Sequence, residues 1–371
     1  MLYLTGVLQE GCAAIVRNVS GTARLTLFVP DPDLTVDAWD GKPITATAGE
    51  EVFGADDVRP MSSLPRVLRS LRASGTRFYT EDSVRQSLAQ SRARVREDLG
   101  RAEPLPYMTH ALRWKKSDAE LELLRQVASG TCEAFEEAIA HSLREGATEG
   151  SVASTVEHGC RLRGADRMAY PSVSAVGESI NVIHYSRWDR RVTHAPGELF
   201  GMDAGCERAG LCSDITRAWP TSGEFSSAAR DFYEEILDVH KQCVAAATEG
   251  NTLDDMQRKA LELLAGSLRR LGVKGDVRHF FPHNVGHFLG MDVHDCKWVS
   301  NGTPMVGGVV LTCEPALYLP HMPEVPKELR GLGTRIEDML VVRPGGAPPE
   351  VLSGALPTEV ADIEAMLARM R

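Results

Sequence analysis

Two patterns of hydrophobic spacing divide the chain at about residue 105. In the first part, the run Ala23–Val29 alternates between polar and apolar residues, which is typical of a strand. The stretch 63–71 spaces its apolar residues three and four apart and is followed by Gly75, so it predicts a helix. Short strands beside a helix indicate a small α/β domain at residues 1–105.

The second part of the chain begins after a change in composition. The charged stretch Arg92–Arg101 leads into Pro104-Leu105-Pro106, which we interpret as the linker between two domains. Ser117-Asp118-Ala119-Glu120 then forms a capping box ahead of apolar residues at helical spacing, so a helix is predicted to begin there. The second domain is accordingly expected to cover residues 106–371.

Long helices alternate in blocks with strands in this second domain. Because the blocks do not form regular βαβ units, the pattern favours an α+β fold in which helices back a sheet. Apolar spacing predicts helices from about Ser151 to Gly164, around the stripe of Phe232, Ile236, Val239 and Cys243, and from Leu253 to Leu271 with Gly272 as the stop. Strands are predicted at Leu199–Ala204, Val309–Cys313 and Met339–Val342.

Composition narrows the classes of function. The chain has 371 residues, and its net charge of −10 comes without a basic stripe, which argues against a nucleic-acid partner. No run approaches the ~20 apolar residues of a membrane span, so no membrane partner is expected. The eight cysteines include no CxxC pair and are predicted to be reduced and buried, in a reducing compartment. Met1–Gly6 lacks the features of a signal or transit peptide and is predicted to form a strand.

Four carboxylates lie at apolar, strand-like runs. Asp203 and Asp214 are eleven positions apart, while Glu314 follows one predicted strand and Glu337 precedes another. Such acids would repel one another and be costly to bury unless cations held them. With His287 they supply five hard ligands, and oxygen-rich ligation with one imidazole favours a pair of Mn²⁺ or similar ions over a structural zinc. Two ions roughly 3.5–4 Å apart would also activate a bridging water near neutral pH.

Five motifs in order resemble those of the Xaa-Pro aminopeptidases, which belong to the pita-bread metallopeptidases together with prolidase and methionine aminopeptidase. The resemblance extends from residue 117 to the C-terminus and implies a pita-bread fold for the second domain. The sequence of the histidine motif, His283–Asp295, is most similar to that of the mitochondrial group of Xaa-Pro aminopeptidase 3 and the intermediate-cleaving peptidases. The motifs are Asp203–Glu207, Ser213–Pro220, His283–Asp295, Glu314-Pro315 and Gly331–Asp338.

The resemblance assigns a role to each hard ligand. Asp203, Asp214, His287, Glu314 and Glu337 would hold the two metal ions, with Asp214 and Glu337 bridging both. Glu314 would also be catalytic, because it would carry the proton from the bridging water to the leaving nitrogen, which must be protonated to leave.

Other side chains match positions that contact the substrate. His294 would stabilise the oxyanion on the scissile carbonyl, and His184 would act as a second catalytic histidine near the scissile bond. His283 and Tyr170 match substrate-binding positions, with His283 in the pocket for the residue after the bond. Arg335 is expected to fix a neighbouring acid or the loop by a charge-assisted hydrogen bond. The remaining histidines match no motif and are expected to be structural.

The resulting hypothesis is a dinuclear-metal aminopeptidase that hydrolyses Xaa-Pro peptides by attack of a metal-bridging hydroxide and releases the N-terminal residue. Two alternatives share this chemistry and differ in the substrate pocket. One is a prolidase restricted to Xaa-Pro dipeptides, and the other is an intermediate-cleaving peptidase that trims a non-proline N-terminal residue from imported proteins. A third, of another class, is a non-catalytic binding module of the same fold. The five intact ligand positions favour an enzyme over this module.

The same resemblance implies a shortened first domain. Xaa-Pro aminopeptidases carry a longer N-terminal domain that contributes to self-association, and Met1–Gly6 resembles a strand from its middle. We therefore expect a partial N-terminal α/β domain and a homodimer that this shortening weakens. The resemblance implies a mitochondrial location, whereas a cytoplasmic one is expected if this start, without a transit peptide, is the true one.

Overall fold

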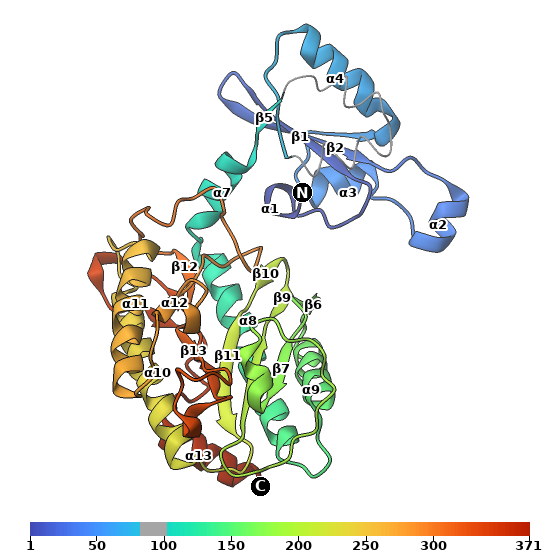
Figure 1. Cartoon of the computed structure of the whole chain (residues 1–371). Coiled ribbons are helices and arrows are strands. Elements are labelled where there is room, and N and C mark those ends of the chain that lie inside the picture. Colours follow the sequence, from blue (N-terminus) through green and yellow to red (C-terminus); the bar gives the residue numbers. More distant parts are fainter. Residues whose placement is uncertain (82–101) are drawn as a thin grey trace. The chain divides into compact units, whose positions relative to one another are not determined.

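The computed structural model describes residues 1–81 and 102–371 and contains two compact units, Met1–Thr109 and His110–Arg371 (Figure 1). The predicted linker stretch Arg92–Arg101 lies outside the described residues. Within the described ranges, no helix combines the length and apolar character that crossing a membrane needs. All eight cysteines are free thiols, and seven of them are buried, as their spacing predicted.

The first unit is built on a small mixed sheet. The hairpin of β1 (Ala13–Val19) and β2 (Thr22–Val29) is extended by β3 (Asp57–Pro60), which is parallel to β2. Successive residues of a strand face opposite sides of the sheet. Phe28 accordingly packs with Leu64 and Leu68, while Leu27 and Val29 form a separate cluster with Val7. The unit also contains α1 (Leu2–Thr5), α2 (Leu34–Asp40), α3 (Ala46–Glu51), η1 (Met61–Ser63), α4 (Leu64–Ala73), and the pair β4 (Tyr79–Thr80) and β5 (Glu103–Pro104).

The prediction of a strand at Met1–Gly6 was wrong. Leu2–Thr5 is a single helical turn, and Gly6 ends it with φ 73° and an N–H that donates to the Leu2 carbonyl at 2.7 Å. Glycine reaches this left-handed conformation without the steric cost that a side chain brings. An apolar run this short does not distinguish helix from strand by periodicity, so the glycine stop decided the outcome.

Helices of the second unit begin and end at local signals. α8 (Asp118–Ser142) starts at the predicted capping box, where Ser117 and Glu120 bond to each other's backbone. α9 (Glu149–Leu162) begins two residues before the predicted Ser151 because Thr148 caps it. The other elements of this group are α7 (Pro106–Trp114), which begins in the first unit, then α10 (Ser227–Ala246), α11 (Leu253–Arg270), α12 (Val277–Phe280), α13 (Val360–Met370), η2 (Gly177–Asn181), η3 (Lys327–Leu329) and η4 (Pro344–Gly346).

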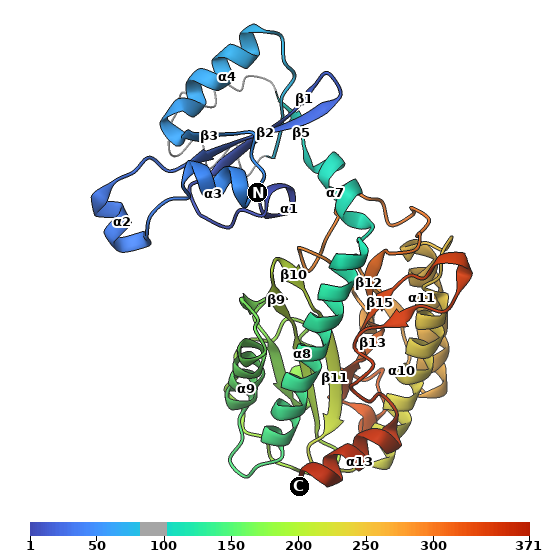
Figure 2. The same cartoon turned by 180° about the vertical axis from the view of Figure 1, so that it is seen from behind.

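Short sheets lie between these helices, and α9 lies on the opposite side of the strands from α10 and α11 in both views (Figures 1 and 2). Phe200 stacks on Trp219 across β8 and β11, with ring centroids 5.0 Å apart, in the buried centre of this unit. The antiparallel sheets are β11 (Ile215–Pro220), β8 (Leu199–Ala204) and β7 (Val173–Val176); β12 (Val310–Cys313), β15 (Asp338–Val341) and β16 (Glu350–Val351); β10 (Leu211–Cys212), β9 (Cys206–Arg208) and β6 (Arg167–Met168); and β13 (Ala316–Tyr318) with β14 (Gly333–Arg335).

Candidate metal centre

The register of β8 and β11 brings two of the predicted ligands to one face. Asp203 pairs with Thr216 across the two antiparallel strands. Asp214 comes two residues before Thr216, and residues two apart on a strand point to the same side. The carboxylates of Asp203 and Asp214 therefore lie on one side of this strand pair.

β12 and β15 bring two more acids to the same place. Cys313 pairs with Asp338, so Glu314 and Glu337, one residue beyond the pair on each strand, lie opposite each other. A bridge between Thr216 and Glu337 joins this sheet to β11. His287 lies alongside, because its carbonyl accepts a hydrogen bond from Thr312 N at 2.9 Å. Residues far apart in the sequence thus converge through strand pairing.

Three of the five side chains form a compact group of potential ligands. One ligand atom each of Asp214, His287 and Glu337 lies within 4.8 Å of the others. His287 Nε2 is 3.3 Å from Asp214 Oδ2 and 3.6 Å from Glu314 Oε1. Glu314 therefore borders the group through His287, and Asp203 lies at its edge on β8. Four oxygen donors and one imidazole fit hard divalent cations.

Asp203 is held by neutral and positive donors. Arg335 forms an ion pair with its Oδ2, which is the charge-assisted bond that the sequence indicated for this arginine. The Tyr170 hydroxyl lies 2.5 Å from one oxygen of Asp203 and 2.5 Å from one oxygen of Asp214. Because a phenol carries one hydrogen, Tyr170 can donate to only one of these carboxylates at a time. The structure therefore places Tyr170 against two of the predicted ligand carboxylates.

Electrostatics at the centre favour a bound cation. Burial raises the pKa of Asp203 to about 6 and that of Glu314 to about 7, although Arg335 opposes both shifts. Burial and the neighbouring carboxylates raise the pKa of Glu337 well above its usual range. Burial disfavours the charged form of His287, but hydrogen bonding to Asp214 and the charge of Glu314 raise its pKa to about 9. Each shift reports carboxylates held close together in a dry site, a condition that divalent cations relieve.

The predicted substrate-side histidines surround the same group. The ring centroids of His294 and His287 are 4.4 Å apart in an edge-to-face arrangement. His283 Nδ1 is 3.5 Å from Glu314 Oε2, and burial lowers the pKa of His283 to about 4, so its ring is neutral. His184 is near enough for its charge to act on His283 and His294. His184 and His294 are exposed whereas Asp214 and Glu337 are buried, so the group has an open side lined by histidines.

Two side chains at the centre were missed by the sequence analysis. The Thr216 hydroxyl donates to Glu337 Oε2 at 2.7 Å and accepts from Arg335 Nε at 3.0 Å. The Tyr318 hydroxyl is 2.7 Å from Arg335 Nη1 and 3.0 Å from His283 Nε2. The spacing of Thr216 two residues after Asp214 is a usable signal, because it predicts a shared face. Tyr318 has no comparable signal, since only the pairing of β13 with β14 brings it to Arg335.

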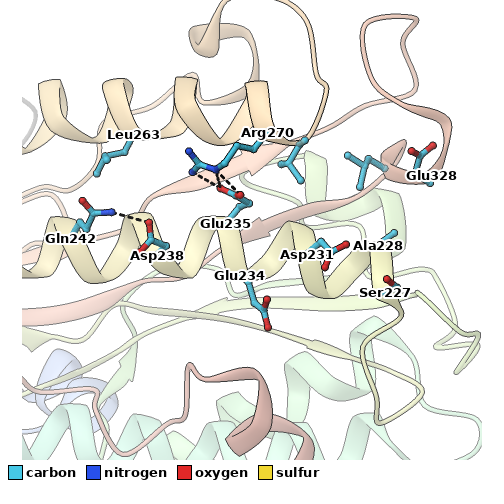
Figure 3. Close-up of a pocket in the computed structure, with 12 residues that line it drawn as sticks. Ser227, Ala228, Asp231, Glu234, Glu235, Asp238, Gln242, Leu263, Arg270 and Glu328 are labelled. Atoms are coloured by element: carbon cyan, nitrogen blue, oxygen red, sulfur yellow. Dashed lines mark hydrogen bonds and ion pairs between the residues drawn. The ribbon is translucent and has the colours of Figure 1, made fainter.

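A groove elsewhere on the second unit contains none of the predicted site residues (Figure 3). It runs between α10, α11 and η3 and is lined largely by acids, including Asp231, Glu234 and Glu328. Glu235 is paired with Arg270 at 2.6 Å inside it. The groove is therefore separate from the candidate metal centre.

Comparison with known families and structures agrees with this geometry. Residues 122–344 match metallopeptidase family M24, and residues 1–79 match the aminopeptidase P N-terminal domain. The mitochondrial intermediate cleaving peptidase 55 of Arabidopsis thaliana is 38% identical over 99% of this chain and 74% of its own length. Xaa-Pro aminopeptidase 3 of Rattus norvegicus is 33% identical over 99% of this chain and 76% of its own.

Solved structures give the same result. Icp55 from Saccharomyces cerevisiae superposes with a TM-score of 0.91 at 28% identity, covering 100% of this chain and 88% of that one. Zinc-substituted Escherichia coli aminopeptidase P in complex with product has a TM-score of 0.86 at 28% identity and the same coverage. The predicted pita-bread fold and hydrolase class are thereby confirmed. The chain belongs to metallopeptidase family M24 and is a pita-bread hydrolase of the aminopeptidase P type, with relatives among the Xaa-Pro aminopeptidases 3 and the intermediate cleaving peptidases.

Proposed function

We propose that this chain is a dinuclear-metal aminopeptidase that releases the N-terminal residue from peptides with proline at the second position. The convergence of Asp214, His287 and Glu337, bordered by Glu314 and Asp203, carries the proposal. Relatives named Xaa-Pro aminopeptidase 3 support the proline preference. Asp203, Asp214, His287, Glu314 and Glu337 would hold two cations, for which Mn²⁺ is our first choice because oxygen ligands dominate the set.

When bound, two divalent cations polarise a carbonyl oxygen and acidify a water molecule. The chain's own residues then supply proton transfer and orientation. Glu314, whose Oε1 lies 3.6 Å from His287 Nε2, would accept a proton from the attacking water and return it to the leaving nitrogen.

The histidines act on the substrate side of the proposed reaction. His294 is exposed beside His287, where it can donate to the oxygen that becomes negative in the transition state. His184 and His283 flank the same opening, and the neutral His283 ring, held by the Tyr318 hydroxyl, suits the apolar proline ring. Tyr170, which is half-buried, orients the carboxylates of Asp203 and Asp214, and its assignment to substrate binding is part of the proposal.

A second function is favoured by a specific comparison. The relative named intermediate cleaving peptidase 55 is 38% identical to this chain. Such an enzyme would use the same centre on a non-proline N-terminal residue of a protein substrate. A mitochondrial location suits both functions, because that relative is described as mitochondrial. We also propose that the chain forms a homodimer. A prolidase limited to Xaa-Pro dipeptides is the third candidate function.

A peptide series distinguishes these candidates. The Mn²⁺-loaded chain would be assayed on Xaa-Pro, Xaa-Pro-Yaa and matched non-proline tripeptides, with its mass in solution measured alongside. Strong preference for Xaa-Pro-Yaa would support the aminopeptidase. Cleavage of the dipeptide alone would move the assignment to a prolidase, and preference for the non-proline series would move it to an intermediate-cleaving peptidase.

A further inference from the structure

A buried group of charges lies behind the histidine loop. Arg113, in the last turn of α7, donates through Nη2 to Asp295 Oδ1 at 2.5 Å and to Asp292 Oδ2 at 2.8 Å. Lys116 Nζ is 3.7 Å from Asp295 Oδ2. The side chains of Asp295 and Lys116 are 0% and 2% exposed, so these charges are removed from water. None of these side chains belongs to the predicted metal or substrate set.

Stability alone is a weak explanation for this charge group. Two charges taken out of water are compensated only when geometry and hydrogen bonding are nearly complete. Here, within the part of the chain that the structure describes, the buried atoms Asp295 Oδ2 and Arg113 Nε have no hydrogen-bond partner. An apolar replacement of similar volume is often no less stable. The group therefore requires a reason beyond the free energy of folding.

The hydrogen bonds of Asp295 provide a reason for keeping these charges. Asp295 directly follows His294, and its own N–H donates to the Phe288 carbonyl at 2.8 Å, which closes the segment 288–295 into a loop. Asp295 Oδ1 also accepts from Cys296 N at 2.8 Å. One carboxylate thus holds the end of the loop at the point where His294 leaves it.

Residues next to Arg113 in the sequence also hold the start of this loop, at Phe288. Trp114 packs edge-to-face on Phe288, next to His287, with centroids 5.8 Å apart. Lys116 N donates to the Gly308 carbonyl at 2.9 Å, which anchors the stretch to the body of the unit. A Cβ on Gly290 would lie only 2.9 Å from Lys116 Nζ and closer still to Asp295 Oδ2, so the loop backbone packs directly against this charge pair and a side chain would not fit there.

We propose that residues 113–116, the junction between α7 and α8, form a positioning element for His294. Arg113 and Lys116 fix the Asp295 carboxylate, Trp114 fixes Phe288, and the loop between them holds the His294 ring against His287. Arg113, Lys116 and Asp295 are positioning residues, since they touch the loop and not the predicted ligands. The inference rests on the proposed role of His294 in the aminopeptidase reaction.

Kinetics of the full-length, Mn²⁺-loaded enzyme test this proposal. A displacement of about 1 Å in a catalytic group can cost about 100-fold in rate. Asp295→Asn, which keeps the shape of the side chain, should lower kcat about 10- to 100-fold and leave KM and metal content nearly unchanged. In a His294→Ala background the same substitution should lower kcat no further, because the positioned group is gone. Arg125→Gln, which breaks a half-buried ion pair with Glu350 away from the histidine loop, is the matched control and should leave kcat unchanged.

A second pair of variants covers the case in which Asp295→Asn does not fold. Arg113→Gln should lower kcat in the same way, and Arg113→Lys should recover part of the loss because it returns a cation to Asp295. The imidazole NMR signal of His294 in metal-free, histidine-labelled enzyme, assigned with His294→Ala, should shift in Arg113→Gln but not in Arg125→Gln. This signal reports the position of the ring without any turnover.

Different results would overturn the positioning role and the proposed reaction. Losses of kcat that add fully to those of His294→Ala, or an unmoved His294 signal, would show that the junction serves stability alone and would overturn the inference. An unchanged kcat in His294→Ala itself would instead contradict the proposed reaction. In that case a shifted His294 signal would still support the positioning role.

Discussion

Arg335 and Asp203 form an ion pair between β14 and β8 across 132 residues of sequence, and both side chains are largely buried. The cation of this pair lies beside a group of acids that themselves fit divalent cations. Arg335 therefore compensates the charge of Asp203 in the metal-free protein, and a metal ion bound at Asp203 would take over part of that compensation. If Asp203 is a ligand, the stability lost on removing Arg335 should depend on metal.

The first prediction concerns Arg335→Gln. Breaking a buried pair costs about 3–5 kcal/mol because one charge is left unpaired, so the metal-free variant should lose about this much free energy of unfolding. The Mn²⁺-loaded variant should lose less, since Asp203 then has a cation. Denaturant unfolding with and without Mn²⁺ measures the difference.

The matched control is Arg163→Gln. Arg163 pairs with Glu133 and Glu137 on α8, away from the predicted ligands. Its loss of stability should be the same with and without metal. Equal losses for Arg335→Gln in both states would contradict the view that Asp203 is a ligand.

A second prediction concerns pH and the metal-free protein. The folded pKa values of Asp203 and Glu314, about 6 and about 7, lie above their ordinary values of 3.8 and 4.5. Groups with raised folded pKa values contribute stability below the unfolded pKa and lose it as pH rises through the folded value. Ionisation of these two acids should therefore make the apo protein less stable between pH of about 4 and about 7.

Metal should reverse this dependence. A bound cation requires ionised carboxylates and a neutral His287, so stabilisation by Mn²⁺ should grow as pH rises over the same interval. Thermal unfolding scans of apo and Mn²⁺-loaded protein across the interval provide the measurement. An apo protein whose stability rises with pH there would show that these acids are not buried together as described.

The third prediction separates two catalytic roles. Glu314→Gln should abolish turnover, because it removes a ligand charge and the proposed proton carrier together. His294→Ala should lower kcat far more than it raises KM, since the oxyanion exists only in the transition state. Steady-state kinetics on an Xaa-Pro-Yaa peptide measures both, and effects confined to KM would refute the assigned roles.

Local signals predicted much of this architecture. The strand Leu199–Ala204 has the predicted bounds, and α8 begins at the predicted capping box. Hydrophobic spacing and caps act over a few residues, so sequence shows them directly. The prediction of a strand at Met1–Gly6 was wrong because six residues offer too little periodicity to outweigh the helix stop at the glycine.

The side-chain contacts at the candidate metal centre were harder to predict from the sequence. Acids in apolar runs indicated a metal site because burying charge without compensation is costly. The bond of Thr216 to Glu337 and that of Tyr318 to Arg335 depend on how separate sheets pair. No local pattern in the sequence encodes the register between distant strands. The roles of Thr216 and Tyr318 could therefore be identified only from the structure.

A metal titration of the exhaustively chelated chain, assayed on an Xaa-Pro-Yaa peptide, tests the dinuclear mechanism most directly. The apo protein should be inactive, and its turnover should return with Mn²⁺ and be complete at about two equivalents. Glu337→Gln should lose this recovery, because one of the proposed bridging ligands is gone. Full turnover after complete removal of metal, or equal turnover in Glu337→Gln, would contradict this mechanism.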